Sequence, residues 1–460
     1  MAQALPLLAS PLLARLFSPE AFGLQALFLS VSSVVLVLAT LRLDLAEVLA
    51  ASRREALDIL SLGGLQTLGI ALLTAVTAAL LAPQLANMTG HEGSHAWVWA
   101  IAPMIVALSA VQLASGLLTW LKRFGPVSQA QVANQVSYLA IALGLGLWAS
   151  PVEGLVFARL GGQLVAAIGL TWLLRSFMSE LRFPPRADRP GLWARCKPFL
   201  VFNTPYSLVG VIGREVPVFA FSAVAASAAA GFYGLARTLL WAPASLLAAS
   251  LSQVFYREAA EHRGTPRLEA LVFRMLLATT GATAPVFAVL AIWGDVGFSL
   301  VFGKQWVAAG HYAMVLALPS WLAIQTAWPE RLFESVGRQG VSFAIQVTFD
   351  VMSAVIVFSS VLTGQPYLAT VALFAGINTA FHLAYLTGMV SVSGLPMRSL
   401  VHALATGGLI FAGTAAACWA IRLAAGAELG GLLLATSLAL LAAATLARRG
   451  YRSIAEVGAA

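Results

Sequence analysis

The chain has 460 residues, of which 60% are hydrophobic and only 10% are charged, and its formal net charge is +8. A soluble domain carries about 25% charged residues, so this composition excludes a water-covered globule and indicates that the lipid bilayer is the solvent. The two cysteines, Cys196 and Cys418, lie far apart in the sequence, which argues against a disulfide framework or a cysteine metal site.

Apolar runs of membrane-spanning length recur along almost the whole chain. A span needs about 20 mostly apolar residues. The first run is short and lacks the basic region of a cleaved signal peptide, so we expect a retained helix. Short polar breaks separate the fifth span from the sixth and the eleventh from the twelfth, so a twelve-span count stays open. We predict an all-α polytopic membrane protein with about 14 transmembrane helices, over residues 2–17, 22–41, 59–83, 97–120, 129–149, 152–174, 198–222, 228–255, 271–294, 309–332, 341–362, 366–392, 399–421 and 427–446.

Positive charge is concentrated at one end of these spans. Assigning the connections alternately to two sides of the bilayer places 21 of the 27 Lys and Arg on one side and only Arg15, Lys304 and Arg422 on the other. By the positive-inside rule the richer side is cytoplasmic. Both termini then face the cytoplasm, which requires an even number of spans. The net charge thus follows from topology and needs no nucleic-acid partner.

The connections hold little that points to an enzyme. The longest is the basic, proline-bearing stretch 175–197, which divides the chain after the sixth predicted span, and no loop is long enough to fold as a catalytic domain. His91 and His95 have i, i+4 spacing, but they sit in a glycine-containing turn and not on a helix. We therefore expect no enzymatic activity, no metal and no cofactor.

Three arginines, Arg159, Arg214 and Arg237, fall inside predicted spans. A charge near the bilayer centre costs about 2.5–3.5 kcal/mol on insertion scales, and such residues usually face a cavity or a partner. An anionic ligand would explain three cations near the midplane. Structural ion pairing and snorkelling toward the interface are the alternatives. We predict that the three arginines bind an anionic headgroup.

Carboxylates inside the predicted spans are few. Asp350 lies in the eleventh span, where it either carries a coupling proton or cation or simply pairs with an arginine. Glu215, next to Arg214, is the second candidate for coupling or pairing. Asp44 and Glu47 follow the second span, and for them we expect a solvated helix end.

Several segments resemble one family when taken in order. They are residues 16–23 (LFSPEAFG), 41–46 (LRLDLA), 230–237 (AGFYGLAR), 252–260 (SQVFYREAA) and 302–310 (FGKQWVAAG). They resemble the polysaccharide transporters, which are lipid-linked oligosaccharide (O-antigen) flippases of the multidrug/oligosaccharidyl-lipid/polysaccharide superfamily. Residues 21–24 also echo residues 231–235, as expected of an internal repeat.

The resemblance implies two six-helix lobes around a central cavity, residues 1–174 and 198–392. The basic linker 175–197 would join them, and residues 393–460 would form two additional helices and a cytoplasmic tail. Members of the family carry an undecaprenyl-diphosphate-linked oligosaccharide from the cytoplasmic to the periplasmic leaflet by alternating access. Arg237 falls on an arginine position of the family motif.

The same resemblance implies a location and partners. The location is the bacterial inner membrane, and the pathway is surface polysaccharide biosynthesis, whether of lipopolysaccharide O-antigen, capsule or exopolysaccharide. The partners are the lipid-linked oligosaccharide, membrane lipids, a glycan polymerase and glycosyltransferases.

Two other functions compete with the flippase. A multidrug or cation antiporter of the same superfamily would need carboxylates in its cavity, whereas these spans offer arginines. A membrane-bound glycan polymerase or glycosyltransferase would need a large periplasmic loop or paired carboxylates for a metal, and the sequence has neither. The residues favour the flippase and keep the antiporter as the alternative.

Overall fold

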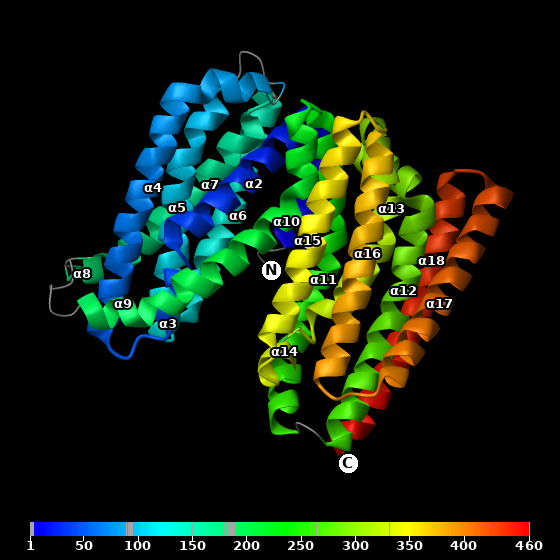
Figure 1. Cartoon of the computed structure of the whole chain (residues 1–460). Helices are drawn as coiled ribbons and strands as arrows, with labels where there is room; N and C mark the ends of the chain where they lie inside the picture. The colour runs from blue at the N-terminus through cyan, green and yellow to red at the C-terminus, as the bar shows by residue number, and fades with distance from the viewer. Residues whose placement is uncertain are drawn as a thin grey trace. The chain divides into compact units, whose positions relative to one another are not determined.

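The structure is a computed structural model that describes residues 4–88, 90, 95–148, 151–178, 180–181, 189–262, 265–330 and 332–459, and all secondary structure in these ranges is helical (Figure 1). The chain forms two compact units, Met1–Gly231 and Phe232–Ala460. The boundary between them falls within one helix, α11 (Ser227–Glu261). His91, considered above for a metal site, lies outside the described residues.

The first unit is organised around α2 (Pro19–Thr40). The helix begins where Ser18 Oγ accepts a hydrogen bond from the backbone N–H of Ala21, with Pro19 in the first turn, and both residues favour a helix start. The remaining elements are α1 (Ala4–Leu16), α3 (Leu43–Val48), α4 (Arg53–Met88), α5 (Ala96–Trp120), α6 (Phe124–Trp148), α7 (Gly154–Leu173), α8 (Arg175–Met178), α9 (Arg189–Pro198), the π-helix η1 (Phe199–Asn203) and α10 (Thr204–Ala223). Helix α2 packs against α4, α5, α7 and α10, and α1 packs against α6.

The second unit is organised around α12 (Pro266–Phe302), which packs against α13 (Val307–Ala327), α17 (Met397–Ala425) and α18 (Leu429–Ala459) (Figure 1). Helix α16 (Tyr367–Val392) packs against α13 and α15 (Gln339–Leu362). Two short elements, η2 (Lys304–Trp306) and α14 (Leu332–Ser335), complete the unit. The chain leaves α12 at Gly303 with φ of 108°, a conformation that favours glycine.

Eleven helical segments in the described part of the chain are long and apolar enough to span a bilayer. The protein is thus an all-helical polytopic membrane protein, as its composition predicts. Eleven of the predicted spans coincide with these segments, and the other three fall on α1, α10 and α11. The closely spaced pairs are separate helices: α6 and α7 are distinct, and the chain turns between α15 and α16 at Gly364, with φ of 73°.

Large apolar side chains are exposed along faces of several of these helices. On α4, Leu65, Leu68 and Leu72 follow one another at helical spacing and are 51%, 58% and 67% exposed. In water, a contiguous apolar face of this kind marks an interaction site. On a membrane-spanning helix, the same apolar face is the surface that contacts the lipid chains.

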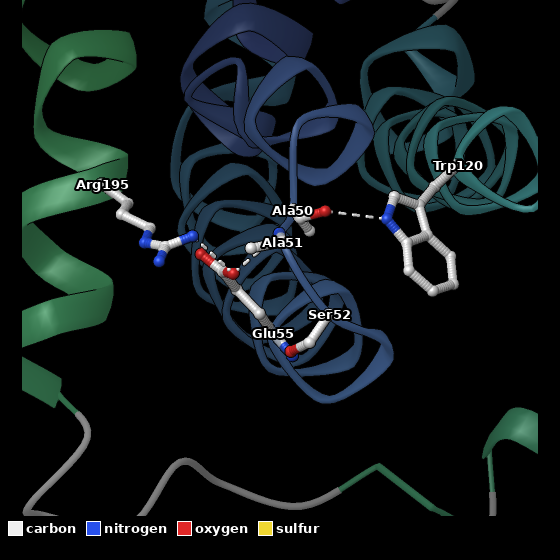
Figure 2. A network of polar contacts seen from close by, with 6 residues as sticks. All are labelled: Ala50, Ala51, Ser52, Glu55, Trp120 and Arg195. Carbon is white, nitrogen blue, oxygen red and sulfur yellow. Dashed lines mark hydrogen bonds and ion pairs between the residues drawn. The ribbon is translucent and has the colours of Figure 1, made fainter.

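The predicted basic connection 175–197 contains helices α8 and α9, and α9 is tied to the start of α4. Arg195 Nη1 on α9 donates to Glu55 Oε2 on α4 at 2.7 Å, and the same oxygen accepts the backbone N–H of Ala51 at 2.9 Å (Figure 2). Trp120 Nε1 at the end of α5 donates to the carbonyl oxygen of Ala50 at 2.9 Å. These contacts hold the α3–α4 turn between α5 and α9.

Candidate functional site

Arg159 is held inside the α7 span by groups that leave part of its guanidinium unused. Its Nη1 donates to Gln135 Oε1 on α6 at 3.4 Å, and its Cζ lies 3.8 Å from the ring centroid of Tyr138. Its Nε is buried and has no hydrogen-bond partner among the described residues. Among the described residues the arginine contacts an amide and an aromatic face, and no carboxylate is paired with it.

The surroundings of Arg159 are polar but neutral. The hydroxyl of Tyr138 accepts a hydrogen bond from Gln25 Nε2 on α2 at 3.2 Å. One helical turn away, Asn134 Nδ2 on α6 donates to Gln163 Oε1 on α7. Amide and phenol side chains therefore line the contact between α2, α6 and α7. These groups carry no charge, so they do not neutralise the charge of Arg159.

Arg214 and Glu215 lie together on α10, and they face different surroundings. Glu215 is half-buried, and its Oε2 accepts a hydrogen bond from Ser30 Oγ on α2 at 2.7 Å. The side chain of Arg214 is exposed. Glu215 therefore helps to hold α10 against α2, a contact that its place beside Arg214 in the sequence does not indicate.

Arg237 and Asp350 belong to the second unit. Arg237, on α11, is half-buried, and its Cζ lies 6.0 Å from the ring centroid of Tyr233 one turn earlier. Tyr233 in turn packs edge-on against Phe374 of α16, with ring centroids 5.8 Å apart. Asp350 Oδ2 on α15 accepts a hydrogen bond from Gln346 Nε2 at 2.8 Å.

The predicted site residues are thus divided between the units. Arg159, Arg214 and Glu215 belong to the first, and Arg237 and Asp350 to the second. The structure brings Arg159 together with Tyr138 and Gln135. A single cavity that contains all three arginines stays a prediction.

Glu47 is placed differently from the expectation of a solvated helix end. Its side chain is completely buried, and neither carboxylate oxygen has a hydrogen-bond partner among the described residues. The reason is that α3 packs against α5. There Glu47 lies against Gly116, a residue that is distant from it in the sequence. The charge of Glu47 and its position after a predicted span indicate an exposed residue. The one signal for burial in the sequence is Gly116 of α5, which has no side chain to occupy the space that Glu47 takes.

No group of three or more His, Cys, Asp or Glu residues that could hold a metal ion occurs in the described ranges. Cys196 on α9 packs against Leu43 and Ala46 of α3, and burial together with the nearby Glu55 carboxylate raises the pKa of its thiol to about 11. The thiol is therefore un-ionised near neutral pH.

Solved structures share the all-helical fold of this chain. A lipid II flippase MurJ in an inward closed conformation matches with a TM-score of 0.74 and 14% identity, covering 98% of this chain and 97% of that one. An inward-facing multidrug resistance MATE family transporter of the MOP superfamily matches with a TM-score of 0.58 and 16% identity, covering 85% of this chain and 95% of that one.

The family model of polysaccharide biosynthesis proteins matches residues 12–311, and the chain belongs to this family. The fold is shared with a solved flippase and a solved multidrug resistance transporter. No curated protein matches the chain.

Proposed function

We propose that the chain is a flippase that moves an undecaprenyl-diphosphate-linked oligosaccharide from the cytoplasmic to the periplasmic leaflet by alternating access. Membership of the polysaccharide biosynthesis family supports the class of substrate. The observation that carries the proposal is the environment of Arg159, whose guanidinium lies in a membrane span without a carboxylate partner in the described part of the chain.

The chemistry of the substrate explains why such an arginine is useful. A diphosphate loses its hydration shell when it enters a bilayer, and charge-assisted hydrogen bonds from guanidinium groups replace that shell well because their geometry fits phosphate oxygens. Arg159 offers an unused Nε–H for such a bond. Arg214 and Arg237 are proposed to contact the same headgroup.

The direction of transport fits the proposed topology. With the cell interior negative, outward movement of an anion is favoured by about 2.3 kcal/mol per charge per 100 mV. The cycle therefore needs no nucleotide hydrolysis to run outward. Glu215 and Asp350 are proposed as the carboxylates that either couple the cycle to a proton or cation or pair with the arginines.

The finer architecture belongs to the same proposal. Fourteen spans would arise if α1, α10 and α11 cross the membrane together with the eleven segments named above. Residues 1–174 and 198–392 would form the two lobes, with residues 393–460 as two added helices and a tail. Both termini would face the cytoplasm of a bacterial inner membrane because 21 of the 27 Lys and Arg then lie inside.

An antiporter for cationic drugs is the second candidate, because the fold of this chain is also found in a multidrug resistance transporter. A cationic solute would need a free carboxylate in the membrane. Glu215 accepts a hydrogen bond from Ser30, and Asp350 accepts one from Gln346. Arg159 would repel such a solute, so the flippase fits the described side chains better.

The test is export of a surface glycan in cells that depend on this chain. Arg159→Ala should reduce export by at least tenfold, and Arg159→Lys should restore only part of it, because lysine lacks the planar guanidinium. Arg214→Ala and Arg237→Ala should abolish export as well. All variants should insert into the membrane at wild-type level, as judged by immunoblot of membrane fractions.

The matched control is Arg448→Ala, which removes an exposed arginine on α18 and should leave export unchanged. Full export by all three intramembrane variants would overturn the anion-binding proposal. Resistance to cationic drugs that depends on the chain, without any effect on glycan export, would favour the antiporter.

A further inference from the structure

The side chain of Glu47 lies in a slot between α3 and α5. The slot exists because residue 116 of α5 is a glycine, which has no side chain to fill it. A Cβ atom added at Gly116 of α5 would lie 2.6 Å from Glu47 Oε2 and 3.0 Å from the carbonyl oxygen of Asp44. No side chain larger than hydrogen therefore fits at position 116 while Glu47 is in place. The carboxyl group lies directly against the backbone of α5.

The immediate neighbours of this carboxyl favour its protonated form. Neither oxygen of Glu47 receives a hydrogen bond within the described residues, although buried polar groups in proteins nearly always find a partner. The Asp44 carbonyl oxygen beside it is an acceptor and cannot stabilise a negative charge. Burial first, and the negative charge of Asp44 second, raise the pKa of Glu47 well above its usual range.

No cation on the elements packed around α3 donates a hydrogen bond to Glu47 among the described residues. Helix α5 and η1 contain no ionisable side chain. On α4, Arg54 pairs with Asp58. Arg53 of α4 pairs with Glu180, and Glu55 of α4 pairs with Arg195 of α9. The remaining ionisable residues of α9 are Arg189, Cys196 and Lys197.

The charges within and next to α3 itself are Asp44 and Arg42. Asp44 carries a buried Oδ1 without a partner, and Arg42 carries a buried Nε without one, in the described part of the chain. Arg42 precedes α3 with φ of 57° and makes no hydrogen bond to Glu47 there. The carboxyl of Glu47 thus receives no hydrogen bond from a cation within the described residues.

We propose that Glu47 is a proton-binding site of this protein, which holds its proton while α3 is packed against α5 and releases it when water reaches the slot. The site would link the protonation of one carboxyl to the packing of a short helix between two membrane spans. The proposal does not depend on which solute the chain carries.

The experiment is an infrared titration of the purified full-length protein in detergent between about pH 5 and about pH 9. The wild type should show a protonated carboxylic-acid C=O band that persists to neutral pH and disappears toward the alkaline end, and Glu47→Gln should lack it.

Removal of the Asp44 charge lowers the repulsion that an ionised Glu47 feels, so the titration midpoint in Asp44→Asn should move to lower pH than in the wild type. Glu20→Gln, which removes an exposed carboxyl on α2, should leave the band unchanged.

A second measurement needs no variant. In wild-type protein made with ¹³C-labelled glutamate, one carboxyl should titrate above about pH 6, outside the usual range of glutamate. If no glutamate carboxyl titrates above that value and the Glu47→Gln spectrum equals that of the wild type at every pH, Glu47 is ionised throughout and the proposal is overturned.

Discussion

Gly23 on α2 and Gly231 on α11 cross with their backbones in direct contact. A Cβ added at Gly23 would collide with the carbonyl oxygen of Ser227, and one added at Gly231 would collide with that of Pro19 and lie 2.9 Å from the backbone nitrogen of Gly23. The relationship is reciprocal, since each glycine is covered by the residue four positions before the other. Gly23 and Gly231, one from each of the two segments that echo each other in the sequence, thus meet at this crossing.

We predict that Gly23→Ala and Gly231→Ala each force the two helices apart. Overpacking of a tight contact costs about 1–3 kcal/mol, and here the obstacle is backbone, which cannot rotate away. Each variant should unfold at a lower temperature in detergent than the wild type. Gly64→Ala on α4 is the matched control, because nothing lies within 4 Å of its added Cβ. Equal thermal stability of all three would contradict the crossing.

Arg422 on α17 and Asp295 on α12 form a two-pronged ion pair, with Nη1–Oδ1 at 2.9 Å and Nη2–Oδ2 at 2.7 Å. The side chains are 21% and 16% exposed, so the pair is only partly screened by solvent. Hydrogen bonds to charged groups contribute about 1.5–3 kcal/mol. We predict a coupling energy of about 1–3 kcal/mol between Asp295→Asn and Arg422→Gln, measured by thermal unfolding of both single variants and the double variant. Additive losses of stability would show that the pair contributes nothing.

Cys196 should react slowly with maleimide at neutral pH. Its pKa is raised to about 11, and the thiolate is the reactive form, so the labelling rate should keep rising about tenfold per pH unit beyond pH 9. A thiol with the usual pKa of about 8.5 would approach a plateau there. The measurement is mass-spectrometric labelling of a Cys418→Ala protein across this range, with denatured protein as the control. A plateau near pH 9 in the folded protein would show that the thiol is exposed.

Much of the fold could be predicted from the chain alone, because a membrane span leaves a strong signal. Each span must be apolar over about 20 residues whatever it packs against, and so the predicted spans fall on helices. The family resemblance at residues 16–23 and 230–237 could also be read directly and is confirmed by the family match. The same hydropathy pattern predicted that Arg159 lies in a span, and Arg159 belongs to α7, one of the helices of spanning length.

What surrounds a side chain inside the membrane could not be read in this way. Hydropathy does not say which face of a helix meets which neighbour, and so the amide and aromatic contacts of Arg159 and the Ser30 contact of Glu215 needed the tertiary structure. Glu47 shows the physical reason most clearly. The sequence by itself determined that a carboxylate follows the second span, but its burial was decided by Gly116 on another helix, where the missing side chain leaves just enough room for the carboxyl group.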